Sequence, residues 1–340
     1  NYLSPTPTQT PSPTPTPTPL PESVRLEGVK YQFQTFNNCG PANLAMALSY
    51  WDWEGDQHVT GNWLRPNSRD RNVMPYEMVD FIRSETDLSV ILRYGGDIET
   101  IKRFVAAGFP VLIEKGYEVA DAGWMGHYGV VTGYDDQKSQ FIFQDSYSKN
   151  GQNLVYSFEK TENYWQAFNY LYLVIYPADR EDEIVSILGP HVDEAYNLDH
   201  AAEKALDETE TKQGRELFFA WFNFGSILRI QNNYFGAAQA FDKAYEVLQI
   251  EFEGYNPVWR ITWYQTDPYF AYFYVNRYQD VIDLANDTLS NSFEPAIEET
   301  WVWRGRAKVA LGDIEGGIED FRTALEWHPG WWVAEQELQN

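Results

Sequence analysis

The sequence predicts an α+β domain followed by an all-α domain. In the first half, short β-rich apolar runs alternate with helical patterns, and from about Asp179 onward the pattern is helical throughout. The 340 residues are also too many for one ordinary hydrophobic core and suit two domains. We therefore expect a tail at residues 1–21, the α+β domain at 22–178 and the helical domain at 179–340.

The tail contains a run, residues 4–19, that reads SPTPTQTPSPTPTPTP. Alternating Pro and Thr form neither helix nor sheet and favour extended polyproline II. Such a segment is typical of an extracellular stalk or stiff linker, which predicts an extracellular or cell-surface location. It is either unmodified or carries O-glycans on threonines, and the candidate positions are Thr6, Thr8, Thr14, Thr16 and Thr18.

Composition excludes several classes of function. The formal net charge of −25 would repel phosphate backbones and anionic membranes, so we expect no nucleic-acid partner. No run of 18 apolar residues exists, so no membrane span is expected. The chain begins at Asn1, and we expect its targeting segment to have been removed. The five histidines lack metal-ligand spacing, so neither a metal nor a cofactor is predicted.

The single cysteine lies in the segment Gln34-Thr-Phe-Asn-Asn-Cys39-Gly-Pro, and no intramolecular disulfide is possible. Apolar residues at i, i+4 and i+7 from Leu44 predict a helix, and Pro41 suits its first turn. Cys39 would then sit at a helix N-terminus, a position that favours the nucleophilic thiolate. Gln34 could supply a side-chain amide to an oxyanion hole beside the backbone N–H of Cys39.

Two further segments supply partners for the thiol. Gly126-His127 precedes a β-rich run that ends in Gly-Tyr, so His127 is predicted to begin a strand. Asp145 ends the apolar run that starts at Phe141. If these strands are adjacent and antiparallel, Asp145 would orient the imidazole of His127, which would in turn keep Cys39 as thiolate and protonate the leaving amine.

Together these segments resemble the C39-like family of papain-like cysteine peptidases over about residues 28–177. The family order is Gln-x4-Cys-Gly-Pro, then Gly-His with aliphatic residues and Gly-Tyr, then a strand ending in Asp. It maps here to Gln34, Cys39, His127 and Asp145, although Asp is commonly followed by Pro in the family and here by Ser. The resemblance implies a helix bearing the nucleophile, packed on an antiparallel sheet with strands at about 110–114, 127–134, 140–145 and 171–176.

The resemblance implies hydrolysis of peptide or isopeptide bonds, and the same residues could transfer acyl groups. A branch of the family cleaves leader peptides after double glycine inside ABC exporters. That substrate is not carried over, because this chain has neither membrane spans nor a Walker A phosphate loop.

Two segment pairs in the second half resemble the tetratricopeptide pattern of Trp, Leu-Gly, Tyr, Ala, Phe, Ala and Pro. Residues 221–228 precede 234–244, and residues 301–305 precede 312–329. Residues 278–285 match the second helix of a degenerate third copy. Small residues would let paired helices approach closely. A preceding helix near residues 192–208 would cap this stack or join the two domains.

The helical domain has more aromatic residues than a small core needs, and some are expected at an interface. They are Trp259, Trp263, Tyr264, Tyr269, Phe270, Tyr272, Phe273 and Tyr274. The repeats would bind a partner or a second copy of the chain, or else only buttress the first domain.

Three functions follow from these patterns. The first is an extracellular thiol peptidase acting on a peptide or protein substrate, with repeats for partner binding or self-assembly. The alternative is a structural subunit of an extracellular filament or other homo-oligomeric assembly, in which the tail and the repeats make the contacts. The third is a module that captures peptide or acyl segments without turnover.

Overall fold

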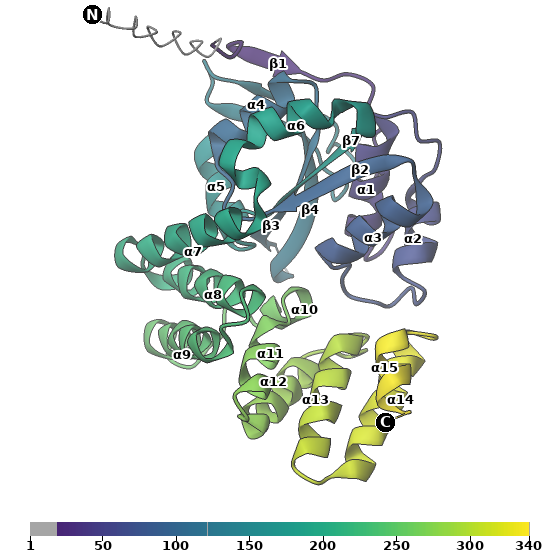
Figure 1. The fold of residues 1–340 in the computed structure, drawn as a ribbon, viewed down its shortest axis with the longest axis vertical. Coiled ribbons are helices and arrows are strands. Elements are labelled where there is room, and N and C mark those ends of the chain that lie inside the picture. Colours follow the sequence, from purple (N-terminus) through teal and green to yellow (C-terminus); the bar gives the residue numbers. More distant parts are fainter. Residues whose placement is uncertain (1–18, 121, 340) are drawn as a thin grey trace, which may run out of the picture.

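The computed structural model describes residues 19–120 and 122–339 (Figure 1). Within them, seven strands form one antiparallel sheet: β1 (Ser23–Arg25), β2 (Leu88–Arg93), β3 (Val111–Val119), β4 (Gly123–Asp135), β5 (Gln140–Gln144), β6 (Leu154–Ser157) and β7 (Tyr172–Pro177). Neighbours in the sheet follow the order β2-β7-β3-β4-β5-β6, and β1 pairs with β4. The tail threonines lie outside the described residues.

Helices cover both faces of this sheet (Figure 1). They are α1 (Cys39–Ser49), α2 (Gln57–Leu64), α3 (Pro75–Glu85), α4 (Ile98–Ala106), α5 (Phe158–Gln166) and α6 (Glu181–Leu188). Helices α1–α3 pack with Tyr128 and Val130 of β4 on one face, whereas α4–α6 pack with Val131 and Tyr134 on the other. Successive strand residues point to opposite faces of the sheet. Strand β4 has a bulge between Val131 and Gly133, and before this bulge its odd-numbered and even-numbered residues belong to different cores.

The rest of the described chain is helical. After the short turns η1 (Ala178–Arg180) and η2 (Gly189–Val192) it contains α7 (Glu194–Thr211), α8 (Gly214–Ile230), α9 (Tyr234–Glu251), α10 (Ile261–Tyr264), α11 (Asp267–Tyr274), α12 (Tyr278–Ser290), α13 (Glu298–Ala310), α14 (Ile314–Trp327) and α15 (Trp332–Glu337). This confirms the predicted α+β region followed by an all-α region. The domain boundary itself stays a prediction, because α6 still packs in the core beside the sheet.

Several predicted elements have different bounds in the structure. Helix α1 ends at Ser49, so Trp51 lies beyond it, and residues 40–49 are buried on every side rather than along one stripe. Strand β4 begins at Gly123 rather than at His127, because residues 123–126 already pair with β3. His127 therefore lies inside a strand. Strands β1, β2 and β6 have no counterpart among the four predicted ones.

The repeat-like segments form helix pairs at the predicted places. A Cβ on Gly225 of α8 would lie 2.9 Å from the ring of Phe241 in α9, and one on Gly305 of α13 would lie 2.5 Å from Phe321 in α14. At these two crossings only glycine lets the paired helices approach closely enough for the aromatic ring to fill the gap. The assignment of these pairs to tetratricopeptide repeats remains a prediction.

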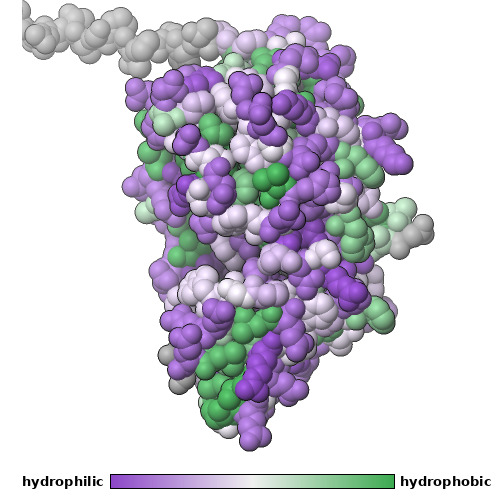
Figure 2. All heavy atoms as spheres, turned by 90° about the vertical axis from the view of Figure 1, so that its right-hand side faces the viewer, coloured by the Kyte–Doolittle hydropathy of each residue, from purple (hydrophilic) through white to green (hydrophobic). Residues whose placement is uncertain are grey.

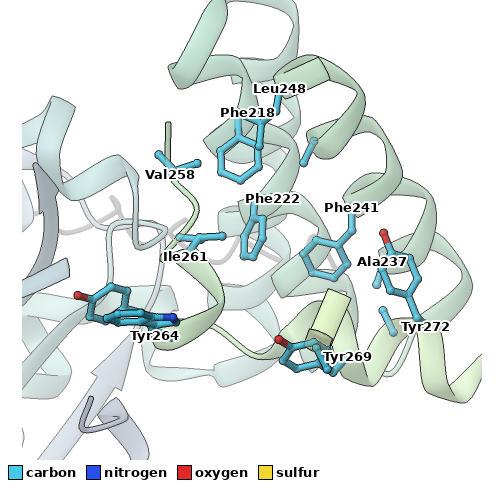
Figure 3. Close-up of a cluster of buried hydrophobic side chains, with 14 of the residues drawn as sticks. Phe218, Phe222, Ala237, Phe241, Leu248, Val258, Ile261, Tyr264, Tyr269 and Tyr272 are labelled. Atoms are coloured by element: carbon cyan, nitrogen blue, oxygen red, sulfur yellow. The ribbon is translucent and has the colours of Figure 1, made fainter. Parts of the chain in front are cut away.

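The two halves share one hydrophobic core, and Figure 3 shows its members in the helical half. Trp124 and Phe168 from the sheet region pack in the same cluster as Phe218, Phe222 and Tyr264 from the helical region. Seven of the eight surplus aromatic residues are buried or pack partly against this cluster, and Tyr274 is the exposed one. The interface predicted for them is therefore formed largely within the chain.

Candidate active site

Helix α1 begins at Cys39, and its start is fixed by the residue just before it. The side chain of Asn38 donates to the carbonyl of Gln57 (3.1 Å) and accepts from the guanidinium of Arg65 (2.9 Å). A Cβ on Gly40 would lie 3.0 Å from Val73, so this position admits little more than hydrogen. The local sequence thus places the sulfur at the free N-terminal end of a helix whose body is buried.

The environment of the thiol opposes its ionisation. Cys39 is partly exposed, and burial by its surroundings raises the pKa of the thiol. The backbone N–H of Tyr128 and the charge of Arg65 lower the pKa, whereas the charge of Glu114 raises it. Desolvation prevails over the field of the helix N-terminus that favours a thiolate. Cys39 therefore keeps its proton at neutral pH and needs a base to become a nucleophile.

His127 and Asp145 form a buried pair on adjacent strands. Strand β5 ends at Gln144, and the next residue turns its carboxylate to the imidazole of β4, with Nε2 and Oδ1 2.8 Å apart. Both side chains are 2% exposed. A carboxylate accepts only, so Nε2 carries the proton of this bond and Nδ1 presents a lone pair. Such an imidazole is the tautomer that can take a proton through Nδ1.

Sequence reasoning missed Lys115, which binds the second oxygen of the same carboxylate. It lies opposite His127 in the register of β3 and β4, and its Nζ is 2.9 Å from Oδ2 of Asp145. The ammonium is wholly buried and also lies 5.4 Å from the ring of Tyr117. The lysine that ends the apolar run Val-Leu-Ile-Glu-Lys was the signal available in the sequence, since a buried lysine almost always has a partner.

Burial and neighbouring charges shift the pKa values of His127 and Asp145. Burial lowers the pKa of His127, the charge of Asp145 opposes this, and the charge of Lys115 lowers the pKa further. Burial alone would raise the pKa of Asp145, but Lys115 and His127 hold it well below its ordinary value. The carboxylate is thus permanently ionised, and the imidazole is neutral at pH 7.

Gln34 is connected to both α1 and the Asp145 segment. Its Oε1 accepts from the hydroxyl of Ser146 (2.8 Å). That hydroxyl also accepts from Asn43, whose amide reaches the carbonyl of Cys39 (2.9 Å). With Oε1 engaged in this way, the side-chain NH₂ of Gln34 is the group left to donate to a substrate oxygen.

The structure brings together most of the predicted site but not all of it. Gln34 and Asp145 are linked through Ser146, and Asp145 binds His127. Cys39 lies beside the backbone of Tyr128, the residue after His127. Among the hydrogen bonds of residues 19–120 and 122–339, none joins the thiol to the imidazole.

The helical region forms one wall beside these residues. A Cβ on Gly126 would lie 2.9 Å from the ring of Tyr264 in α10 and 2.7 Å from that of Phe168. Burial raises the pKa of the Tyr264 phenol well above its ordinary value. Gly126 is therefore required by the close approach of α10 to the strand that carries His127.

No group of three or more His, Cys, Asp or Glu side chains suited to a metal ion occurs in the described part of the chain. Nor does any helix there have the length and apolar character needed to cross a membrane.

One family model matches part of the chain. Among curated proteins, none matches the chain. Among solved structures, a crystal structure of a candidate C39-like peptidase from Bacillus anthracis is 18% identical, with a TM-score of 0.37, and the match covers 46% of this chain and 98% of that chain. Residues 26–173, which include all four sequence-predicted site residues, match the model described as the Peptidase C39 like family, so this segment is similar to C39-like peptidases.

Proposed function

We propose that the chain is a thiol peptidase in which Cys39 is the nucleophile, His127 the general base and acid, and Asp145 the residue that orients His127. The observation that carries this proposal is the buried His127–Asp145 bond of 2.8 Å, which leaves Nδ1 of His127 as the proton acceptor. Cys39 contacts the backbone of Tyr128, the residue that follows His127. The family match of residues 26–173 supports the same assignment.

In the reaction, Nδ1 of His127 takes the thiol proton as Sγ of Cys39 attacks the carbonyl carbon of the substrate. The side-chain amide of Gln34 and the backbone N–H of Cys39 donate to the developing oxyanion. The C–N bond then breaks, and His127 returns the proton to the leaving amine. Water next attacks the thioester with His127 as base, which releases the acid and restores the thiol. Contacts of this kind commonly tighten only when substrate binds.

A peptide library digested with the full chain and read by mass spectrometry tests the proposal. The wild type should cleave a defined subset, and Cys39→Ala should abolish cleavage. Asp145→Asn should retain the fold but lose about 10²–10⁴-fold in turnover, and Gln34→Ala about 10²–10³-fold. Adding glycinamide separates acyl transfer from hydrolysis, because it would appear in the products of a transferase. Cleavage that persists in Cys39→Ala rules the mechanism out.

A second candidate function is a subunit of a larger extracellular assembly. Figure 2 shows hydrophobic side chains gathered on the lower part of the molecule, where α13–α15 lie. At the turn between α13 and α14, Val309, Leu311 and Ile314 are exposed. An exposed apolar group of this kind is typical of a contact surface. Light scattering as a function of concentration tests it: a Leu311→Glu, Ile314→Glu variant should reduce the mass, and a wild type that is always monomeric contradicts self-assembly.

The extracellular location and the glycans are proposed from the tail composition alone. Protease treatment of intact source cells should degrade an extracellular protein. The mass of the tail peptide should exceed its sequence mass by whole monosaccharide increments if threonines such as Thr6 carry O-glycans.

A further inference from the structure

Glu114 is a buried carboxylate without a charged partner. It is 1% exposed on β3 and points to the α1–α3 face, opposite to its neighbour Lys115. Its Oε1 has no hydrogen-bond partner within the described residues, and neither of its oxygens takes part in an ion pair there. Tyr128 lies across the strand pair, but its single hydroxyl proton goes to the carbonyl of Val73 at 2.8 Å.

Of the other buried carboxylates of the described chain, Asp70 accepts a backbone N–H from Asn72 and has no ion pair, whereas the remaining three bind a cationic side chain or a histidine. Asp145 binds Lys115 and His127, Asp320 binds Arg304 and Lys308, and Glu298 binds His328. Because a buried charge without a partner is costly, Glu114 either stays protonated or binds a cation that the chain does not supply. Burial raises the pKa of Glu114 well above its ordinary value, and the hydroxyl of Tyr128 offsets this only in part.

Glu114 lines a cavity of about 120 Å³ between the sheet region and the helical region. This volume is several times what one water occupies. Two further buried polar atoms without partners belong to residues that line the same cavity: Oγ of Ser226 and Nε of Arg229. The cavity therefore combines an acceptor on one strand with a hydrogen-bond donor and a hydroxyl on α8.

The charges around the cavity favour a cation at Glu114. Arg229 is already neutralised by an ion pair with Asp267, so the carboxylate of Glu114 is the uncompensated charge of the lining. Aromatic side chains, including Tyr94, Tyr264 and Phe168, form much of the wall, and an ammonium group is attracted to such rings. The overall charge of −25 would also concentrate cations at the surface.

We propose that this cavity binds a small primary ammonium compound that also carries a hydrogen-bond acceptor, with the ammonium on Glu114 and the acceptor on Arg229 Nε and Ser226 Oγ. One such ligand satisfies all three partnerless atoms. A neutral ligand leaves the carboxylate without a counter-charge, and a simple alkylammonium leaves the donor of Arg229 unpaired. The cavity is thus a ligand site whose lining does not include Cys39 and is shared by both halves of the chain.

The test is calorimetry on the full chain carrying Cys39→Ala, so that binding is separated from any turnover. The probes are 2-aminoethanol, n-propylamine and ethylene glycol, which have the same number of heavy atoms. 2-Aminoethanol should bind best and should raise the melting temperature with concentration. n-Propylamine should bind more weakly, and ethylene glycol at least about tenfold more weakly than 2-aminoethanol, because it lacks the charge-assisted bond.

Glu114→Gln, which keeps the shape and removes the charge, should weaken 2-aminoethanol at least about tenfold. The matched control is Glu118→Gln on the same strand, whose carboxylate is half-exposed and bound to Arg215 outside the cavity; it should bind as the parent does. Nα-acetyl-lysine amide presents the same ammonium on a peptide-like side chain. Its binding supports the site and identifies peptide side chains as the source of the ligand. Binding of 2-aminoethanol alone supports a free small molecule.

Three results would overturn the proposal. The first is the absence of heat and of thermal stabilisation with every probe, which would mean that the cavity holds water only. The second is equal binding of ethylene glycol and 2-aminoethanol. The third is unchanged 2-aminoethanol binding in Glu114→Gln. If that variant does not fold, the comparison of the three probes on the parent still decides the question.

Discussion

Replacing Lys115 with Met should make Cys39 react with iodoacetamide at lower pH than it does in the wild type. Lys115 and His127 occupy the two oxygens of Asp145 at 2.9 and 2.8 Å, and a charged imidazole would therefore lie close to the ammonium. The repulsion disfavours the imidazolium that must form when the thiol gives up its proton to His127. Methionine keeps the length of the side chain and removes this repulsion.

The size of the effect follows from the geometry. Two cations on the two oxygens of one carboxylate are roughly 5–6 Å apart, which at an effective dielectric constant of about 20 gives a repulsion of about 3 kcal/mol. Relaxation around the site will reduce this figure. Even half of it corresponds to a labelling rate at least about tenfold faster below the midpoint of the pH profile. The pair is buried, so salt should change the result little.

The assay is the rate of iodoacetamide labelling of Cys39 by intact mass between pH 5 and 10, with circular dichroism to check the fold. Lys115→Arg keeps the charge and should leave the profile unchanged. Lys138→Met removes an exposed lysine that pairs with Asp135 at the surface, and it should have no effect on labelling. A profile for Lys115→Met that coincides with the wild type, or moves to higher pH, would refute the reasoning.

Other predictions concern stability and its pH dependence. Gly126→Ala should lower the free energy of unfolding by about 1–3 kcal/mol through overpacking, and a Gly126→Ala, Tyr264→Ala variant should lose less than the sum of the two single changes in denaturant titrations. Burial raises the pKa of Glu77 to about 8, so its pKa in the folded state exceeds that in the unfolded state. The stability that protonation of Glu77 contributes is complete below about pH 4.5 and is lost as the pH rises through 8. Glu77→Gln should therefore flatten the fall in urea midpoint between pH 5 and 9. Arg304→Ala leaves buried Asp320 with one of its two cations and should cost about 3 kcal/mol in thermal melts, with an unchanged value counting against a structural role for the pair.

Local signals in the sequence are enough to predict the helix start at Cys39 and the strand end at Asp145. Pro41 and the apolar pattern mark the first, and the run from Phe141 marks the second. The register between strands is not local, so the pairing of Lys115 with His127 could not be read from the sequence. For the same reason the early start of β4 was missed, since residues 123–126 are extended only because β3 lies beside them.

The helical region shows a different limit of sequence reasoning. Glycines at helix crossings, such as Gly225 and Gly305, are recognisable from their spacing. The excess of aromatic residues was visible in the sequence as well. The sequence did not show whether these side chains face the rest of the chain or an external partner. Tyr264 and Trp263 pack inward, against the sheet region, because that region offers an apolar surface at Trp124 and Phe168. A count of aromatic residues cannot distinguish a partner within the chain from one outside it.

The contact between α10 and Gly126 also determines how the protein can be divided. A fragment that ends near residue 178 would expose Trp124 and Phe168, which lie in the common core, and would remove the wall beside Cys39. The two halves should accordingly melt in a single calorimetric transition, and neither should be portable as a fusion module. The same contact constrains recombination between related genes. An event that exchanges the helical half must also preserve Gly126, the glycine that precedes His127.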